Sequence, residues 1–116
     1  SPAVKAQKDL ISYDEFARMD IRTAIIEAAE AVNKAKKLLK LTVNTGIDRR
    51  TIVSGIAEHY KPEDIIGKKV VMLVNLAPRE IRGIMSQGMI LMAENHEGKL
   101  CFVSPTEDFH PGSEVK

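Results

Sequence analysis

The sequence predicts an all-β fold: a small five-stranded Greek-key barrel with short helices and an irregular C-terminal extension. Its apolar runs are short, which suits buried strands and is too short to cross a membrane. In the clearest run, 39–45, apolar and polar residues alternate as they do in a half-buried strand. A single strand–helix–strand unit stands among segments that otherwise form hairpins, an order typical of a small Greek-key barrel.

The first regular element is a short helix that begins after Ser12. Ser12 and Glu15 have the spacing of a capping box. In this motif the hydroxyl accepts a hydrogen bond from the Glu15 amide, and the carboxylate reaches back to the Ser12 amide. We expect the helix to end near Met19 or Asp20.

A hairpin is predicted over 39–56. The alternating strand 39–45 is followed by turn residues over 46–49, and the returning strand begins at Thr51. Because side chains alternate between the two faces of a strand, one face of this hairpin can be buried in the core.

A short helix over 62–66 follows the hairpin. Pro62 is placed at a first helical position, and Gly67 lies just past the end, where a left-handed residue stops a helix. The order of elements then matches the oligonucleotide-binding fold. The strands expected after this helix are 69–75, 88–94 and 100–103, and the tail from Ser104 is expected to be mostly irregular.

The polar segment 75–88 separates two of these apolar strands and concentrates chemistry. It contains two arginines and several amide and hydroxyl side chains on a predicted turn-forming loop. Loops that a rigid scaffold positions often carry binding residues. From residue types alone, a binding surface and an ordinary solvated loop are equally good interpretations.

The order of residues in this segment resembles the tRNA-binding domain at the C-terminus of methionyl-tRNA synthetases. The same domain occurs in free-standing bacterial tRNA-binding proteins and in the endothelial-monocyte-activating polypeptide. The resemblance covers nearly all of the chain from Tyr13 onward, and the combined match is more specific than any one fragment. The matching positions are Asn75-Leu76, Pro78-Arg79, Ile81, Gly83, Ser86-Gln87-Gly88-Met89, Lys37-Leu38-Leu39, Arg50 to Ile56, Ile66 to Val70 and Pro111-Gly112.

The resemblance decides one local conflict, over 21–37. This stretch is rich in Ala, Glu and Lys, so helix propensity alone predicts a helix. The resemblance implies a strand over 21–29, followed by a loop with lysines. We expect the strand, because tertiary context often overrides propensity and the β-branched residues here permit it.

The resemblance also implies which residues contact tRNA. The loop before Lys37 departs from the family's usual His-Pro-Asn-Ala-Asp, and Lys36 replaces the acid. A solvated mixed-charge surface is the usual interpretation of such a lysine run. The residues implied to bind tRNA are Lys37, Asn75, Arg79, Ser86 and Met89, and the candidate additional contacts are Lys34, Lys36, Lys40 and Arg82.

Met89 has two interpretations, as a core methionine or as a surface contact. Strand alternation places Met89 and Ile90 on opposite faces. If Ile90 fills the barrel, Met89 lies outside, and we expect one patch that also includes Asn75, Arg79 and Ser86. We favour this surface role, in which a flexible thioether can pack against an unstacked base or a sugar.

No catalytic residue, metal or cofactor is predicted. His59, His96 and His110 are scattered, and none has a second ligand at metal-binding spacing. Ser104, Asp108 and His110 lie close together, but on a proline-flanked tail where no strand or helix fixes their geometry. The chain is therefore interpreted as a binding domain and not as an enzyme.

The composition limits how nucleic acid could be bound. The formal net charge is only +1, so any affinity for nucleic acid must come from a local basic face. Aromatic residues are 4% of the chain and Trp is absent, which argues against a base-stacking surface of aromatic rings. The single Cys101 cannot form an intrachain disulfide, which suits a reducing, cytoplasmic setting. No membrane partner is expected.

The domain itself is predicted over 12–116, after a linker or cloning remnant at 1–11. The resemblance implies a homodimer, and we expect 12–19 and 95–116 to meet the second copy. The favoured interpretation is a tRNA-binding module appended to the catalytic body of a methionyl-tRNA synthetase. The alternatives are a free-standing tRNA-binding protein, a peptide-binding export chaperone of the same fold, and a dimerisation module with negligible RNA contact.

Overall fold

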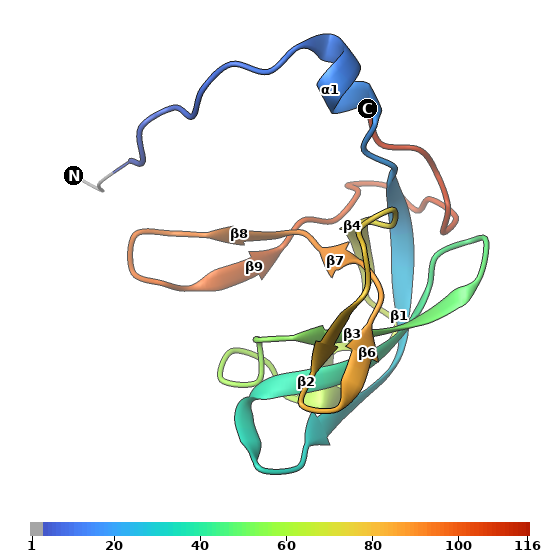
Figure 1. Cartoon of the computed structure of the whole chain (residues 1–116). Coiled ribbons are helices and arrows are strands. Elements are labelled where there is room, and N and C mark those ends of the chain that lie inside the picture. The colour runs from blue at the N-terminus through green and yellow to red at the C-terminus, as the bar shows by residue number, and fades with distance from the viewer. Residues whose placement is uncertain (1–3) are drawn as a thin grey trace.

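A five-stranded antiparallel sheet forms the body of the molecule in a computed structural model that describes residues 4–116 (Figure 1). Two short helices and two small hairpins accompany it. The elements are α1 (Tyr13–Ala17), β1 (Ile21–Val32), β2 (Ala35–Asn44), β3 (Arg49–Ser54), α2 (Pro62–Ile65), β4 (Lys69–Leu73), β5 (Arg79–Ile81), β6 (Ile84–Ser86), β7 (Met89–Ile90), β8 (Met92–Glu94) and β9 (Leu100–Phe102).

The strand β1 is central to the sheet, whose order is β3-β2-β1-β4-β7. Its first half pairs with β4 and its second half with β2, and a register shift between Ile26 and Ala28 bends it between the two partners. Ala24 and Ile26 are fully buried. The predicted strand is therefore confirmed, because hydrogen bonds on both edges and burial outweigh the helix propensity of the same residues. It extends beyond 29 to Val32, so the expected loop with lysines is only the turn at 33–34 before β2.

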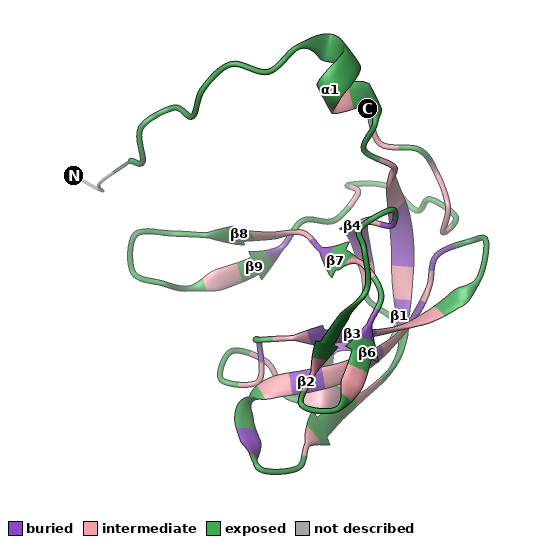
Figure 2. Cartoon of the chain, in the orientation of Figure 1, coloured by how far each residue is buried: buried purple, intermediate pink, exposed green. Residues whose placement is uncertain are grey.

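The core lies on the inner face of the strands, as the alternating pattern predicts. On β2, the alternate residues Leu39, Leu41 and Val43 are each at most 1% exposed. Figure 2 shows buried residues along the sheet strands and an exposed α1. The β2–β3 hairpin is confirmed by its continuous antiparallel register. The predicted helix over 62–66 is confirmed as α2, which buries Ile65 in the core.

The sheet closes into a barrel where β3 meets the chain at the end of β6. The Gln87 amide donates to the Thr51 carbonyl at 2.9 Å, and the Val53 amide donates to the Ser86 hydroxyl at 2.9 Å. We call these two contacts the seam. The all-β class is thus confirmed, and the arrangement resembles the predicted oligonucleotide-binding barrel.

The segment 75–88 is not a simple loop as predicted, because residues 79–86 form the hairpin β5–β6. Arg79 pairs with Ser86, and Ile81 pairs with Ile84. Arg82 and Gly83 form the two-residue turn with φ of 53° and 80°. Two positive φ values are typical of the type I′ turn that suits a tight hairpin, a geometry not apparent from an Arg-Gly pair.

The helix α1 begins with the predicted capping box. The Glu15 amide donates to the Ser12 hydroxyl at 3.1 Å, and the Ser12 amide donates to the Glu15 carboxylate at 3.0 Å. The helix ends at Ala17, slightly earlier than expected, and buries none of its residues. It therefore contributes nothing to the barrel core.

The predicted strand 88–94 is divided at Leu91 into β7 and β8. The Leu91 amide still donates to the Val71 carbonyl at 2.8 Å, after which the chain leaves the barrel and forms the β8–β9 hairpin. The division is a correction to the single predicted strand. It arises because the residues on either side of Leu91 pair with different partners, β4 and β9.

The C-terminal tail is irregular, as predicted, yet it packs against the start of β1. The Gly112 amide donates to the Thr23 carbonyl at 2.7 Å, and the Val115 amide donates to the Ile21 carbonyl at 2.8 Å. A Cβ added at Gly46 would lie 2.6 Å from the Gly112 Cα, so the tail also contacts the β2–β3 turn at close range. The barrel and the tail are thus one packed unit.

Candidate functional site

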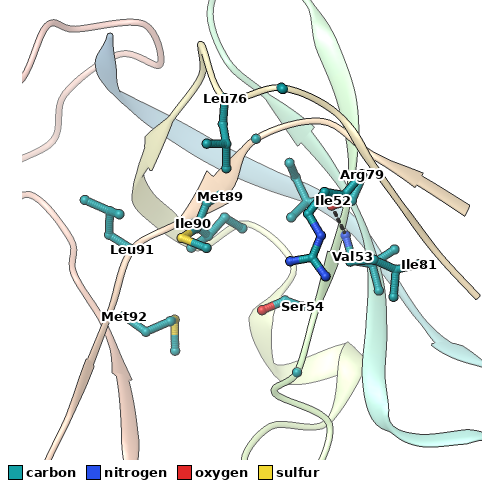
Figure 3. A pocket seen from close by; sticks show the side chains of 14 residues that line it. Ile52, Val53, Ser54, Leu76, Arg79, Ile81, Met89, Ile90, Leu91 and Met92 are labelled. Atoms are coloured by element: carbon teal, nitrogen blue, oxygen red, sulfur yellow. Dashed lines mark hydrogen bonds between the residues drawn. The ribbon is translucent and has the colours of Figure 1, made fainter. Parts of the chain in front are cut away.

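An open slot of about 390 Å³ lies between β3, the β5–β6 hairpin and the chain at Met89–Met92 (Figure 3). Apolar side chains form most of its walls, including those of Leu76, Ile81 and Met89. These residues come from three separate segments, so the slot exists only in the folded barrel.

Arg79 is the charged residue of the slot. Figure 3 shows its side chain extending across the slot toward Ser54. None of the ion pairs formed among residues 4–116 includes Arg79. The guanidinium is exposed, and its planar group remains available to a ligand.

Met89 lies at the surface, as the favoured interpretation expected. It is 51% exposed, whereas its neighbour Ile90 is 6% exposed and belongs to the core. The alternation along β7 therefore directs the Met89 thioether into the slot and Ile90 into the barrel.

Ser86 lines the bottom of the slot but is buried, with an exposed fraction of 6%. Its hydroxyl accepts the hydrogen bond from the Val53 amide at the seam. The expectation that Ser86 belongs to an exposed patch is therefore wrong, because this hydroxyl satisfies a backbone group on a neighbouring strand. Its implied contact with tRNA stays a prediction.

Asn75 is used at a different place from the slot. Its side-chain oxygen accepts from the Asp20 amide at 2.8 Å, and its side-chain nitrogen donates to the Arg18 carbonyl at 2.7 Å. Asn75 thereby joins the end of β4 to the chain that follows α1, and it does not line the slot. The predicted single patch of four residues is thus divided, and the contact of Asn75 with tRNA also stays a prediction.

The basic residues that could contact tRNA form two groups: those that already form an ion pair with an acidic side chain, and those that do not. Arg49 donates to Glu27 at 2.6 Å, and this hydrogen bond lowers the pKa of the Glu27 carboxyl, against the opposing effect of burial. Arg50 likewise donates to Asp48, and Lys40 lies 3.4 Å from Glu30. Within the part of the chain that the structure describes, the candidates outside every ion pair are Lys34, Lys36, Lys37, Arg79 and Arg82.

These unpaired basic residues gather on two hairpins. Lys34 lies in the β1–β2 turn and Lys36 and Lys37 at the start of β2, whereas Arg79 and Arg82 lie on β5–β6. Both turns lie at the lower end of Figure 1. Lys34 and Arg82 have φ of 60° and 53°, which L-residues rarely adopt. Strained basic residues at two exposed turns are consistent with a binding role.

The register connects these two hairpins to the slot. Along β3, Thr51 and Val53 contact Gln87 and Ser86 in antiparallel order, so the β5–β6 turn extends toward Gly55 and beyond. At that end, the Ala57 amide donates to the Lys37 carbonyl at 3.1 Å. This bond continues the β2–β3 pairing beyond Gly55, and Lys37 does not line the slot.

Some residues that line the slot were not predicted from the sequence to contact tRNA. Ser54 and Gly55 border the slot, and Leu76 and Ile81 supply apolar wall. All four fall inside the fragments that carry the family resemblance. Their presence in those fragments is a usable signal, but only the fold shows that they surround one slot.

The described residues hold no arrangement typical of a metal centre or a membrane span. Across 4–116, no group of three or more His, Cys, Asp or Glu side chains is placed to hold a metal ion. In the same range, no helix is both long and apolar enough to cross a bilayer.

A family comparison matches residues 21–114 to the family described as "Putative tRNA binding domain". Among curated proteins, the methionine–tRNA ligase of Cytophaga hutchinsonii is 62% identical over 112 residues, which is 97% of this chain. That of Flavobacterium psychrophilum is 65% identical over 99 residues, or 85% of this chain. The chain spans only 16% and 14% of the lengths of these two ligases.

Two solved structures have closely similar folds. A MetRS related protein from Pyrococcus horikoshii has a TM-score of 0.88 and 38% identity, and the match covers 94% of this chain and 100% of that one. The chaperone CsaA from Bacillus anthracis has a TM-score of 0.85 with 22% identity, over 93% of this chain and 100% of that one. At that identity, the second likeness concerns the fold alone.

Proposed function

The chain belongs to the tRNA-binding domain family, and on that premise we propose that it is a non-catalytic module that captures tRNA by shape. The observation that carries the proposal is the group of unpaired cations on two hairpins beside an apolar slot. Phosphate contacts from such cations supply affinity without reading sequence. With a net charge of +1, attraction to RNA depends on this local face and not on the charge of the whole chain.

The second part of the proposal is attachment to the catalytic body of a methionyl-tRNA synthetase. The alignment with the Cytophaga hutchinsonii ligase covers 97% of this chain but only 16% of the ligase, as expected for an appended domain. A tethered binding module raises the effective concentration of tRNA near the catalytic site without any new contact there. This role is in the cytoplasm, where the single Cys101 stays reduced.

The third part is a homodimer formed through 12–19 and 95–116. The helix α1 buries nothing in its own chain, and Tyr13 is 78% exposed beside the exposed Leu10 and Ile11. Phe109 on the tail is exposed as well. Exposed apolar groups gathered on two segments suit a self-complementary interface between two copies.

Tyr13→Asp tests the dimer more cleanly than deleting the tail after Pro105, because the tail also packs against β1 of its own chain. An acid suits the first turn of a helix, so the variant should fold normally. We expect monomers in sedimentation, whereas Ile66→Asp, a matched change at an exposed residue beyond α2, should remain dimeric. A dimeric Tyr13→Asp would place the interface elsewhere.

Peptide binding is the second candidate function, because the slot is mostly apolar and the chaperone CsaA from Bacillus anthracis shares the fold. Parallel titrations with tRNA and with an unfolded peptide separate the two functions. Arg79→Ala should weaken tRNA binding at low salt. Arg49→Ala removes the same charge from a residue that Glu27 already pairs with and should leave binding nearly unchanged. Equal effects of the two variants, or binding of peptide alone, would contradict the proposal.

A further inference from the structure

We propose that the slot receives one unstacked nucleobase of the bound tRNA, with Arg79 against the base. This inference rests on the proposed function and assigns a ligand to the slot itself. The base would place its ring between the guanidinium and the apolar side chain of Met89, which lies across the slot from Arg79 (Figure 3). Its polar edge would face Ser54, toward which Arg79 also extends (Figure 3).

The slot has the dimensions and the chemistry that such a ligand requires. Its volume of about 390 Å³ falls within the range of pockets that hold small ligands. Leu76 and Met89 are 40% and 51% exposed, so the slot presents apolar surface to water. Covering that surface with the faces of a planar base is favourable, and the base keeps its polar edge near hydrogen-bonding groups.

The seam holds the backbone of Arg79, and no acidic partner occupies its side chain. Arg79 pairs with Ser86 across the β5–β6 hairpin, and Ser86 accepts from the Val53 amide. The hairpin is therefore tied to β3 at the position that carries Arg79. The guanidinium itself is outside every ion pair among residues 4–116, so its planar face is available for stacking on a base.

A base fits the surroundings better than a bare phosphate or a peptide side chain. Phosphates alone need no apolar wall, and an apolar peptide side chain gives no role to an unpaired guanidinium. Lys37, whose carbonyl accepts from the Ala57 amide two residues beyond Gly55, lies outside the slot, where we expect its ammonium group to meet a phosphate elsewhere on the tRNA backbone. A Cβ added at Gly55 would have no atom within 4 Å, so the backbone there leaves room for a ribose.

The nucleotide must come from an unpaired region of the tRNA. Bases within a helix are stacked on both faces, whereas bases in loops and at ends can turn outward and stack on protein groups. Arginine supplies such stacking in proteins that lack aromatic rings at the site. This chain has no Trp and only 4% aromatic residues, so Arg79 supplies the planar group that stacks on the base.

The test uses tRNA transcripts that carry 2-aminopurine at one unpaired position each, titrated with the full chain. We expect the fluorescence to change at one position, because stacking in the slot alters the emission of that base. Arg79→Lys keeps the charge but removes the plane, so it should abolish this change and weaken binding about tenfold. The salt dependence should be unaltered, because the number of cations is the same.

The control is Arg49→Lys, the same substitution at an exposed arginine that Glu27 pairs with, which should behave as the original chain. If tRNA binds but no position responds, or if Arg79→Lys still produces the response, the slot does not hold a base and only the proposed function stands. If the unfolded peptide displaces the responding base, the slot is a peptide site. If tRNA does not bind, the proposed function fails as well.

Discussion

The segment 75–89 contributes residues both to the seam and to the rim of the slot, and these two regions have opposite characters. At the seam, Ser86 is buried, and its hydroxyl is bonded to the Val53 amide across strands. At the rim, Arg79 and Met89 are exposed, and neither the ion pairs nor the core of residues 4–116 includes them. Residues close together in this part of the chain therefore serve either the barrel or its surface.

The difference shows that a family signature combines two kinds of residue. Asn75 and Ser86 form hydrogen bonds that join distant segments of the chain. Arg79 and Met89 have side chains that a ligand can reach. A loss of tRNA binding in a variant would therefore have a different cause in each group, and measurements of folding stability can separate them.

The largest expected effect contrasts the neighbours Ile90 and Met89. Ile90→Ala empties part of the core and should lower the free energy of unfolding by about 2–5 kcal/mol. Met89→Ala should change it by about 0.5 kcal/mol, because that side chain is half exposed, yet it should weaken tRNA binding. Chemical denaturation and tRNA titration of both variants measure this. A large loss of stability in Met89→Ala would indicate that the Met89 side chain packs in the core.

The next effect concerns Gly88, which leads from the seam to β7. Its φ is 113°, and an added Cβ would lie 2.8 Å from the Leu73 carbonyl oxygen and 3.0 Å from the Met72 terminal methyl. Gly88→Ala should therefore cost about 2–3 kcal/mol of stability. Gly83→Ala, at a positive φ of 80° in open space, should cost less. Similar losses in both would mean that the close contact at Gly88 relaxes freely.

Ser86→Ala should lower the free energy of unfolding by about 1–3 kcal/mol, because it leaves the buried Val53 amide without its partner. Arg79→Ala should stay within about 0.5 kcal/mol of the original chain. Any weakening of tRNA binding in Ser86→Ala should then follow the fraction of unfolded protein. If its melting temperature is unchanged while binding is lost, Ser86 contacts the ligand directly.

Lys37→Ala should act on the salt dependence of binding and not on the fold. Removing one phosphate contact should reduce the slope of log affinity against log salt by about 0.7–0.9. Lys40→Ala should have a smaller effect, because Glu30 lies 3.4 Å from that ammonium group. Titrations over a range of salt concentrations give both slopes. A binding affinity that does not depend on salt would contradict phosphate capture by this face.

The smallest expected effect is a gain in stability at the rim. Arg82→Asn places an Asn-Gly pair in the β5–β6 turn, the residues that such a turn favours, and should stabilise the fold by about 0.5–1 kcal/mol. The same change removes an unpaired cation and should weaken tRNA binding. Opposite signs for stability and affinity would indicate that Arg82 is kept for binding. A loss of stability would show that its strained φ is offset by contacts of its side chain.

Local patterns in the sequence are enough to predict several parts of this protein. The capping box at Ser12 and Glu15, the β2–β3 hairpin and the helix after Pro62 all depend on residues close together in the chain. The order of residues around Arg79 and Met89 identified the family, which the match over 21–114 bears out. The exposed position of Met89 followed from the two-residue period of a strand.

Contacts between distant residues decided the remainder. β1 is a strand because β2 and β4 pair with its edges, although its composition favours a helix. Ser86 bonds to Val53 from 33 positions away, and Asn75 bonds to Asp20 from 55 positions away. Which cations lack an acidic partner is also a property of the folded surface. Propensity and periodicity describe neighbours along the chain, whereas hydrogen-bond partners, burial and charge pairing are set only when distant segments pack together.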